Sequence, residues 1–396
     1  MPLIDLRKTS GSPGSFSSDS EVILSDGSDT LVSATAEKGV LDTGGESGSS
    51  GILRKSSLRE LSLNNFRNYH SLDFEFSAPI TVIIGQNGRG KTNLIEAIYL
   101  TSLSKSWRTK DQNLIGEGGQ GYKVQADWVE HKISVEYHPD TRKVIKRSGI
   151  EIKPGQLVGL SPLVLFEPSS LNLFIMGPSY RRGYLDQTLC QISSHYLVKL
   201  NKYNKVMRQR NQALKQQLSQ DLIFAYNLQL VEYGWFIYEQ RTRLIDYYNQ
   251  NLSHWYQEIS GQKEDIAIDY LSNLGSDPDQ YLLNLEKSFS KDIVRQSTSI
   301  GIHHDDILVK IDDQEVRDYA SRGESRTVVL AMKQVELIYI EEVLGKNAIL
   351  LLDDVVSELD YLRRKQLVAM LGKQQSIITT TEAISDLPDS STVFSL

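Results

Sequence analysis

The stretch Gly85-Gln86-Asn87-Gly88-Arg89-Gly90-Lys91-Thr92 decides the fold. It matches the phosphate-binding pattern G-x-x-x-x-G-K-[ST], and its flanks have the form that this pattern requires. The apolar run Ile80–Ile84 before it is typical of a buried central strand, and the periodic apolar residues from Thr92 to Ser104 predict a helix after it. A strand, a glycine-rich turn and a helix in this order predict a P-loop core.

The residue types in this loop suit the binding of phosphate. Glycines let the backbone wrap around an anion, so that successive N–H groups and the helix N-terminus face it. We expect Lys91 to reach the β- and γ-phosphates of ATP, and the hydroxyl of Thr92 to bind Mg²⁺. ATP and Mg²⁺ are therefore the expected ligands, with all eight residues from Gly85 to Thr92 forming the cradle.

A second apolar run, Ala348–Leu352, ends in two acids, Asp353 and Asp354. Parallel strands end at the same edge of a sheet, so Asp353 is expected beside the phosphate loop as a Mg²⁺ ligand. Asp354 is the catalytic candidate that orients or deprotonates the attacking water. Lys91 and Asp353 lie 262 positions apart (353 minus 91), which indicates a large insertion between the two halves of the site.

The chain divides into four segments. Glycine and serine make up 22 of residues 1–57, which predicts a disordered tail. Residues 58–164 form the first part of an α/β head and open with alternating residues typical of an antiparallel lobe. Residues 165–290 predict an inserted, mainly helical arm, and residues 291–396 the second part of the head.

The arm contains a stripe of apolar residues at helical spacing. Such a stripe is more often core packing than a surface on which bases stack. We therefore predict that it faces the arm's interior. Its members are Phe224, Leu228, Val231, Trp235 and Tyr238.

The stretch Ser321-Arg322-Gly323-Glu324 precedes a helix expected from about Arg326 to Ile340. It is similar to the ABC signature motif, whose serine, glycine and helix N-terminus face the phosphate of ATP held by a second subunit. On this interpretation Ser321, Gly323 and Glu324 belong to the nucleotide site. The alternative is an ordinary capping box, in which Ser321 and Glu324 satisfy each other's backbone N–H groups. In the run Asp353–Asp360, the residues after the two acids have the spacing of an ABC D-loop. This match favours the interpretation of Ser321–Glu324 as a signature motif.

Six landmarks in a fixed order carry a resemblance to the RecF family over about residues 58–381: Asn65–Tyr69, Gly90–Tyr99, Arg181–Asp186, Gly301–Asp306, Ser321–Thr327 and Asp353–Asp360. The resemblance implies an ABC-type P-loop head like those of SMC-type ATPases, with the arm inserted. It also implies an ATP-dependent homodimer that clamps duplex or gapped DNA without reading sequence and hydrolyses ATP slowly. RecO and RecR are the implied partners in loading RecA at gaps, for recombinational repair and replication restart.

The chain departs from the family pattern at three positions. Ile302 stands where proline is common, Ser169 where an acid is frequent, and Glu324 where glutamine is usual. Thr379-Thr380-Thr381 occupies the place where transporters and SMC heads carry a switch histidine. We identify no residue of the sequence as the glutamine of a lid loop. These departures bear on the rate of hydrolysis more than on ATP binding.

Two basic stretches are candidates for DNA contact: Lys105, Arg108 and Lys110 after the loop helix, and Lys202, Lys205 and Arg208 in the arm. Members of the second set recur every three residues and share one helix face. Such a face tracks a phosphate backbone without reading bases. The alternative is a solvated helix face; charge alone does not separate the two, and the resemblance favours DNA.

Composition limits the class of protein. The 396 residues carry a net charge of −7, which disfavours a simple nucleic-acid binder but leaves room for local basic stripes. We expect no membrane span, because charge interrupts every apolar stretch, and no signal peptide. The single cysteine, Cys190, forms no internal disulfide, which fits a reducing cytoplasm. His303–Asp306, if it forms a strand, alternates between two faces and is not expected to bind a metal.

Two rival classes remain. An ATPase subunit of a membrane transporter is disfavoured by the long insertion. An SMC-like structural tether or a defence-system ATPase is the closer alternative, but a tether needs long heptad arms, and the inserted segment has no sustained heptad repeat.

Overall fold

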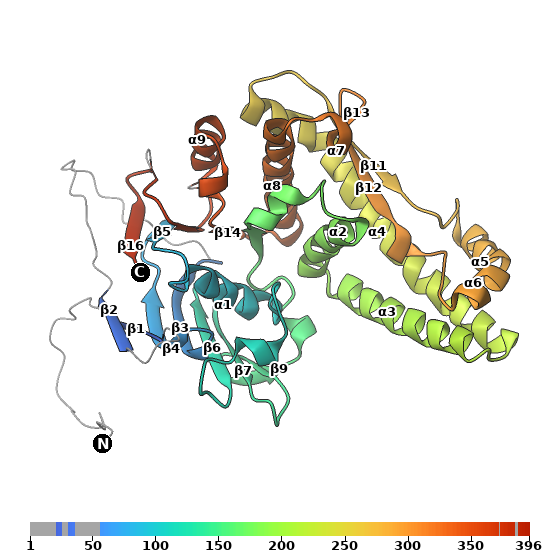
Figure 1. The fold of residues 1–396 in the computed structure, drawn as a ribbon, viewed down its shortest axis with the longest axis horizontal. Helices are drawn as coiled ribbons and strands as arrows, with labels where there is room; N and C mark the ends of the chain where they lie inside the picture. The colour runs from blue at the N-terminus through green and yellow to red at the C-terminus, as the bar shows by residue number, and fades with distance from the viewer. Residues whose placement is uncertain (1–20, 26–30, 36–55, 372, 385–386) are drawn as a thin grey trace.

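The computed structural model describes residues 21–25, 31–35, 56–371, 373–384 and 387–396. It contains a head built on two sheets and an elongated arm that leaves the head on one side (Figure 1). Most of the predicted tail, residues 1–57, lies outside the described residues. Within that segment the structure describes the strands β1 (Glu21–Ser25) and β2 (Leu31–Thr35), which pair with each other, and β1 also pairs with β4.

The core of the head is a five-stranded sheet in which every neighbouring pair is parallel. Its strands come from both ends of the described chain, in the order β10 (Leu163–Phe166), β14 (Ile349–Asp353), β15 (Ser376–Thr380), β5 (Ile80–Ile84) and β16 (Ser391–Ser395). The predicted buried strands are therefore confirmed. In this sheet β15 lies between β5, which leads into the phosphate loop, and β14, which ends at Asp353.

The second sheet of the head is antiparallel, as predicted for the lobe that starts at Leu58. After β2 and β1 its order is β4 (Tyr69–Glu75), β3 (Leu58–Phe66), β6 (Tyr122–Trp128), β7 (His131–Tyr137), β8 (Val144–Arg147) and β9 (Ile150–Ile152).

Helix α1 (Lys91–Leu103) packs in a hydrophobic core shared by the two sheets and is buried on nearly all sides. Alternate residues of the parallel strands, such as Leu351, face α1. Their neighbours, such as Leu352, face a second core that contains the arm and α8 (Arg322–Leu344). This two-sided burial accounts for the uninterrupted apolar runs of the parallel strands.

The arm contains long helices and a small sheet. Its helices are α2 (Pro178–Ile192), α3 (Ser194–Lys215), α4 (Gln220–Ser260), α5 (Pro278–Lys287) and α6 (Phe289–Arg295). Its sheet comprises β11 (Ile266–Leu271), β12 (Asp306–Ile311) and β13 (Gln314–Glu315), and α7 (Val316–Tyr319) leads to α8. In the described part of the chain, short 3₁₀ helices span Asp111–Leu114, Pro154–Gln156, Pro168–Asn172, Ile302–His304 and Val356–Glu358. Helix α9 spans Tyr361–Met370.

The arm differs from its predicted bounds at both ends. Residue 165 lies inside β10, in the parallel sheet of the head, so the insertion begins after that strand. At the other end β12 pairs with β11, which carries the inserted unit beyond residue 290. Helix α4, with 41 residues, runs roughly 60 Å and forms the arm's axis.

The buried face of α4 differs in phase from the predicted stripe. Phe224 and Leu228 are exposed, whereas Ile223, Leu230 and Ile237 are buried. The buried row passes through Gly234, where a Cβ would meet the rings of two tyrosines at 3.1 Å. Because glycine has no apolar side chain, the hydrophobic pattern in the sequence skips Gly234. The predicted stripe therefore followed the neighbouring aromatic residues instead of the buried row. Trp235 and Tyr238, which are partly buried, still pack against the core.

Candidate active site

The phosphate loop joins β5 to α1 and is supported from behind by the turn between β3 and β4. Gly90 caps α1 with φ of 103°, a conformation that residues with a side chain rarely adopt. The hydroxyl of Tyr69 donates to the carbonyl of Gly90 at 3.1 Å, and the amide of Asn68 donates to the carbonyl of Arg89 at 3.4 Å. A Cβ on Gly90 would lie 2.7 Å from both supporting side chains, so the position requires glycine. A Cβ on Gly88 would meet open space, and there the φ of 85° is what favours glycine.

Lys91 turns its charged end back over the loop. Its ammonium donates to the carbonyl oxygens of Gly85, at 2.7 Å, and Gln86, at 3.2 Å. The residue is only 5% exposed, whereas Gln86 and Asn87 at the tip of the loop are exposed. The charge is thus already held at the loop, as the binding of a phosphate requires.

The structure brings the two halves of the site into contact. The Thr92 hydroxyl donates to Oδ1 of Asp353 at 2.9 Å across 261 positions of sequence. A hydroxyl and a carboxylate are hard oxygen donors of the kind that bind Mg²⁺, so the pair fits the ion expected there. Burial raises the pKa of Asp353, although hydrogen bonds from Thr379 and Thr92 oppose the rise.

Asp354 has an unusual backbone and a carboxylate turned inward. Its φ of 54° lies in the left-handed region, which costs a residue with a side chain about 1–2 kcal/mol. Among the described residues its Oδ1 is buried without a hydrogen-bond partner. Backbone strain and an unsatisfied acceptor at one residue are often found where a protein performs chemistry.

Ser321 and Glu324 form the capping box of α8. The Ser321 hydroxyl accepts from the backbone N–H of Glu324 at 3.2 Å, and Glu324 accepts from the N–H of Ser321 at 2.7 Å. This hydrogen bond lowers the pKa of Glu324. No hydrogen bond or ion pair between described residues joins Ser321–Glu324 to Gly85–Thr92. Within one chain, the structure does not bring the signature to the phosphate loop.

The residues just after the signature contact the segment after Asp354. Arg326 pairs with Glu358 at 3.4 Å, and the guanidinium of Arg363 donates to Thr327 at 2.9 Å. A Cβ on Gly323 would lie 2.8 Å from that guanidinium, so the two residues pack closely together. Beside them Tyr361 is 69% exposed. The start of α8 and the start of α9 thus form one surface.

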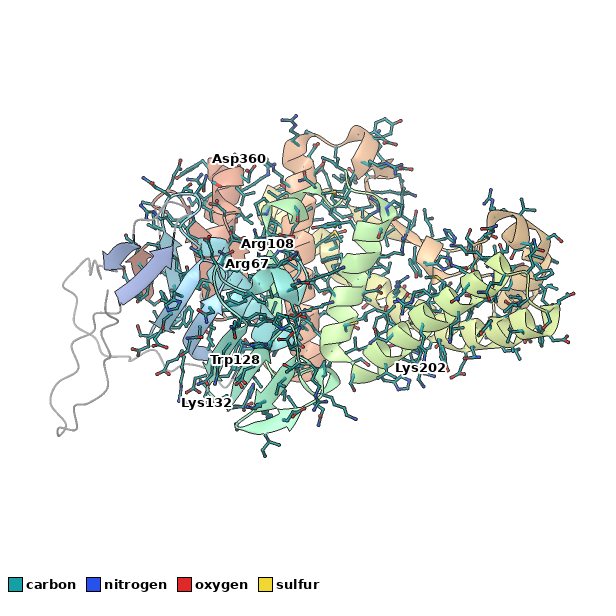
Figure 2. All side chains as sticks on the ribbon, turned by 60° about the horizontal axis from the view of Figure 1, so that its bottom comes forward. Arg67, Arg108, Trp128, Lys132, Lys202 and Asp360 are labelled. Carbon is teal, nitrogen blue, oxygen red and sulfur yellow. The ribbon has the colours of Figure 1, made fainter. Side chains whose placement is uncertain are left out.

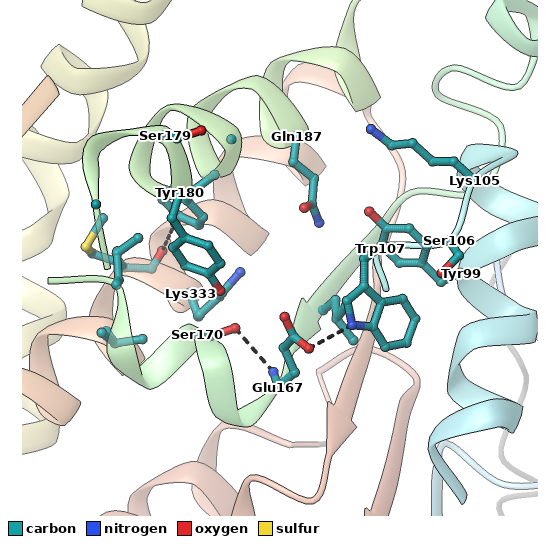
Figure 3. A pocket seen from close by; sticks show the side chains of 17 residues that line it. Tyr99, Lys105, Ser106, Trp107, Glu167, Ser170, Ser179, Tyr180, Gln187 and Lys333 are labelled. Carbon is teal, nitrogen blue, oxygen red and sulfur yellow. Dashed lines mark hydrogen bonds between the residues drawn. The ribbon is translucent and has the colours of Figure 1, made fainter. Parts of the chain in front are cut away.

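A cavity of about 590 Å³ lies between α1, β10, α2 and α8 (Figure 3). Glu167, the residue after β10, points into it and accepts from the indole N–H of Trp107 at 2.7 Å. Lys333 of α8, whose ammonium pairs with Glu336 at 2.9 Å, lines another part of the wall. The cavity therefore lies between the head and the root of the arm.

The six basic residues proposed for DNA contact lie in two separate places. Lys202, Lys205 and Arg208 are exposed on α3, with Lys202 on the arm and Arg108 on the head in Figure 2. Lys105 and Lys110 are exposed as well. Arg108 is 40% exposed and also lies 3.5 Å from the buried carboxylate of Glu96, which holds Arg67 at 2.8 Å.

The basic run on α3 also contains residues that are not available at the surface. Lys199 pairs with Glu232 at 2.8 Å, and Arg210 is fully buried against Asp292. The run is therefore a basic face with a structural arginine beside it, rather than a uniform stretch of free cations.

The prediction that His303–Asp306 binds no metal treated the whole segment as a strand. In the structure only Asp306 belongs to a strand. His303 and His304 lie in a 3₁₀ helix, and both rings bond the carbonyl of Thr298 at 3.1 Å. Asp305 is buried among Arg241, Tyr270 and Ser272, while Asp306 pairs with Arg181 at 2.6 Å. The four side chains therefore hold parts of the arm to one another. Among the described residues no cluster of three or more His, Cys, Asp or Glu side chains is arranged to hold a metal.

The supports of the phosphate loop were missed as functional residues. Asn68 and Tyr69 belong to the quoted landmark Asn65–Tyr69, and the landmark was the available signal. Nothing in the local pattern shows that these side chains reach a loop 21 positions away.

A parallel sheet that carries the phosphate loop, an antiparallel lobe beside it and a long insertion between the two halves of the site define an ATPase head of the ABC type. The AAA domain family matches residues 60–377. RecF of Lachnoclostridium phytofermentans is 34% identical over 334 residues, covering 82% of this chain and 92% of that protein. RecF of Clostridium botulinum is 37% identical over 342 residues, covering 84% and 94%.

Solved structures agree with these relatives. The recombination mediator protein RecF with ATP, in the RecFOR pathway, has a TM-score of 0.78 at 34% identity, covering 85% of this chain and 95% of that one. A second RecF structure reaches a TM-score of 0.80 at 32% identity, covering 86% and 99%. The chain belongs to the RecF family of DNA replication and repair proteins. This membership sets aside the transporter and tether alternatives, and the described residues contain no helix long and apolar enough to cross a membrane.

Proposed function

We propose that the chain binds ATP with Mg²⁺ on its phosphate loop and dimerises on the bound nucleotide. The observation that carries the proposal is the 2.9 Å contact between Thr92 and Asp353, because it joins the two half-sites at the edge of the parallel sheet. Lys91, held by two loop carbonyls, supplies the positive charge for the phosphates. When bound, Mg²⁺ supplies charge neutralisation between the phosphate oxygens.

The chain's own groups divide the remaining work. Asp353 and Thr92 hold the cation, while Asp354 orients the attacking water and accepts its proton. The backbone N–H groups of the loop and the start of α1 bind the phosphate oxygens. The signature residues Ser321 and Gly323 have no phosphate to bind within their own chain, so they serve ATP held by a second copy.

DNA is the proposed macromolecular ligand, clamped as a duplex or at a gap without reading of sequence. The exposed cations on α3 and after α1 support this, because phosphate contacts need positive charge on an accessible face. We further propose that the dimer acts with RecO and RecR in loading RecA, and that slow hydrolysis releases the clamp. We also propose a cytoplasmic location, because Cys190 is the single cysteine of the sequence and has no second thiol for an internal disulfide.

Gel filtration with light scattering tests the proposal. The wild-type chain is expected to elute as a monomer alone and as a dimer with ATP, Mg²⁺ and duplex DNA. Lys91→Ala is expected to bind a fluorescent ATP analogue much more weakly and to stay monomeric. Lys132→Ala is the control, because it removes an exposed lysine of the head that pairs with Asp127 outside the phosphate loop. Equal affinity and equal dimerisation in Lys91→Ala and the wild type would remove the phosphate-loop assignment.

A further inference from the structure

Thr379, near the end of β15, contacts both acids of the candidate site. It is fully buried and lies directly opposite Asp353 in the parallel pairing of β14 with β15. Opposed residues of neighbouring strands send their side chains to the same face of the sheet. The Thr379 hydroxyl accordingly donates to Oδ1 of Asp353 at 2.8 Å.

The same threonine holds the backbone of the next residue. The N–H of Asp354 donates both to the Thr379 hydroxyl, at 3.1 Å, and to the Thr379 carbonyl, at 3.0 Å. Asp354 has a φ of 54°, and such a conformation persists only when its surroundings determine it. One side chain therefore fixes the direction of one carboxylate and the strained backbone that carries the other.

Packing alone does not require a hydroxyl at this position. Strand β15 is buried, and its neighbours Ile377 and Ile378 are apolar residues with branched β-carbons. A valine has almost the shape of threonine and would fill the same space. What valine lacks is the donor to Asp353 and the acceptor for Asp354.

We propose that Thr379 is a positioning residue that orients Asp353 toward Mg²⁺ and sets the backbone of Asp354. The inference rests on the proposed function, because it concerns the metal and water of the same site. It gives a role to the threonine run that stands where related ATPases carry a switch histidine. Partners that orient metal ligands in this way typically change metal affinity or activity about 10- to 100-fold when removed.

The test compares three variants of the full-length chain. Thr379→Val removes the hydroxyl, and Thr379→Ser restores it. Thr380→Val is the matched control, because the Thr380 hydroxyl bonds only Glu382 among its described contacts, at 3.0 and 3.2 Å. The readouts are the affinity for a fluorescent ATP analogue with Mg²⁺ and with EDTA, the Mg²⁺ concentration for half-maximal activity, and kcat and KM.

Thr379→Val is expected to keep the affinity measured in EDTA and to lose most of the gain that Mg²⁺ gives. Its half-maximal Mg²⁺ concentration should rise, and kcat should fall, by roughly 10- to 100-fold. Thr379→Ser and Thr380→Val should stay near the wild type. A merely structural role would lower thermal stability and leave the Mg²⁺ dependence unmoved. If Thr379→Val fails to fold, Thr379→Cys keeps the size with a weak donor, and the same losses are expected.

Asp353→Asn separates this inference from the proposed function. If Asp353→Asn loses the Mg²⁺ response while folded Thr379→Val keeps it, or if Thr379→Ser does not restore it, the role of Thr379 is refuted and the metal site stands. If Asp353→Asn itself binds and hydrolyses ATP as the wild type does, the metal site is wrong and Thr379 has no acid to position.

Discussion

Replacement of Arg210 by methionine tests how the arm holds its basic face. Arg210 and Asp292 form an ion pair at 2.8 Å in which both side chains are completely buried. The guanidinium also donates to Asn227 at 2.7 Å and to Thr298 at 2.8 Å. These contacts fasten α3 to α4 and to the segment around α6. Methionine keeps an unbranched apolar stem, lacks the guanidinium, and leaves the carboxylate buried without its cation.

The size of the effect follows from these contacts. Breaking a buried pair by removing one partner costs about 3–5 kcal/mol. Asp292 keeps hydrogen bonds from Ser299 and Ser288, and Nη2 of Arg210 has no partner among the described residues, so the lower end applies. A loss of about 3 kcal/mol speeds amide exchange that depends on local opening by roughly 150-fold.

Hydrogen exchange with mass spectrometry measures this effect on α3 and α6. Arg210→Met is expected to exchange about two orders of magnitude faster there, with α1 and the head unchanged. Arg208→Met is the matched control, because it removes the same charge two residues away on the exposed face. It should leave exchange alone and lower the salt slope of DNA binding by about 1. Less than a fivefold change in Arg210→Met would refute the view that this pair fastens the arm.

Three further predictions address chemistry, DNA and pH. Asp354→Asn keeps the shape of the side chain but loses the base, so ATP binding should persist while single-turnover hydrolysis slows by about 10²- to 10⁴-fold. Hydrolysis at the wild-type rate would mean that another group is the general base. Reversal of Lys202, Lys205 and Arg208 to Glu should weaken DNA binding for all sequences and flatten its salt dependence, while nucleotide affinity persists; an unaltered salt slope would mean a merely solvated face. Burial lowers the pKa of His303 from 6.5 to about 4, so between these values the unfolded chain takes up a proton that the folded chain does not. Stability should therefore fall by up to roughly 3 kcal/mol as pH drops from 6.5 to 4, and denaturant titrations of His303→Gln should lack this component.

Local patterns predicted the head well, because the chemistry of a phosphate loop depends on neighbours in sequence. The contact of Thr92 with Asp353 followed from a general property of parallel strands, which end at a common edge. The start of the arm was misplaced because β10 is a run of four apolar residues, too short for periodicity to distinguish from a helix.

Local sequence patterns do not show which residues pair across long stretches of chain. Arg210 looks like any other residue of a basic run, and its burial depends on Asp292, 82 positions away. Thr379 was noted only for the histidine that it replaces. Its bonds to Asp353 and Asp354 depend on the register of two strands that the sequence does not specify.

Mixing two inactive variants tests the central claim, that a complete ATPase site forms only between two copies of the chain. Lys91→Ala disables the phosphate loop, and Ser321→Arg places bulk and charge at the start of α8 while leaving the loop intact. In a mixed dimer one composite site carries both defects and the other carries neither. The account predicts that each variant alone is inactive and that an equimolar mixture recovers ATPase activity, which rises with protein concentration. No recovery from folded variants that still associate would contradict a shared site.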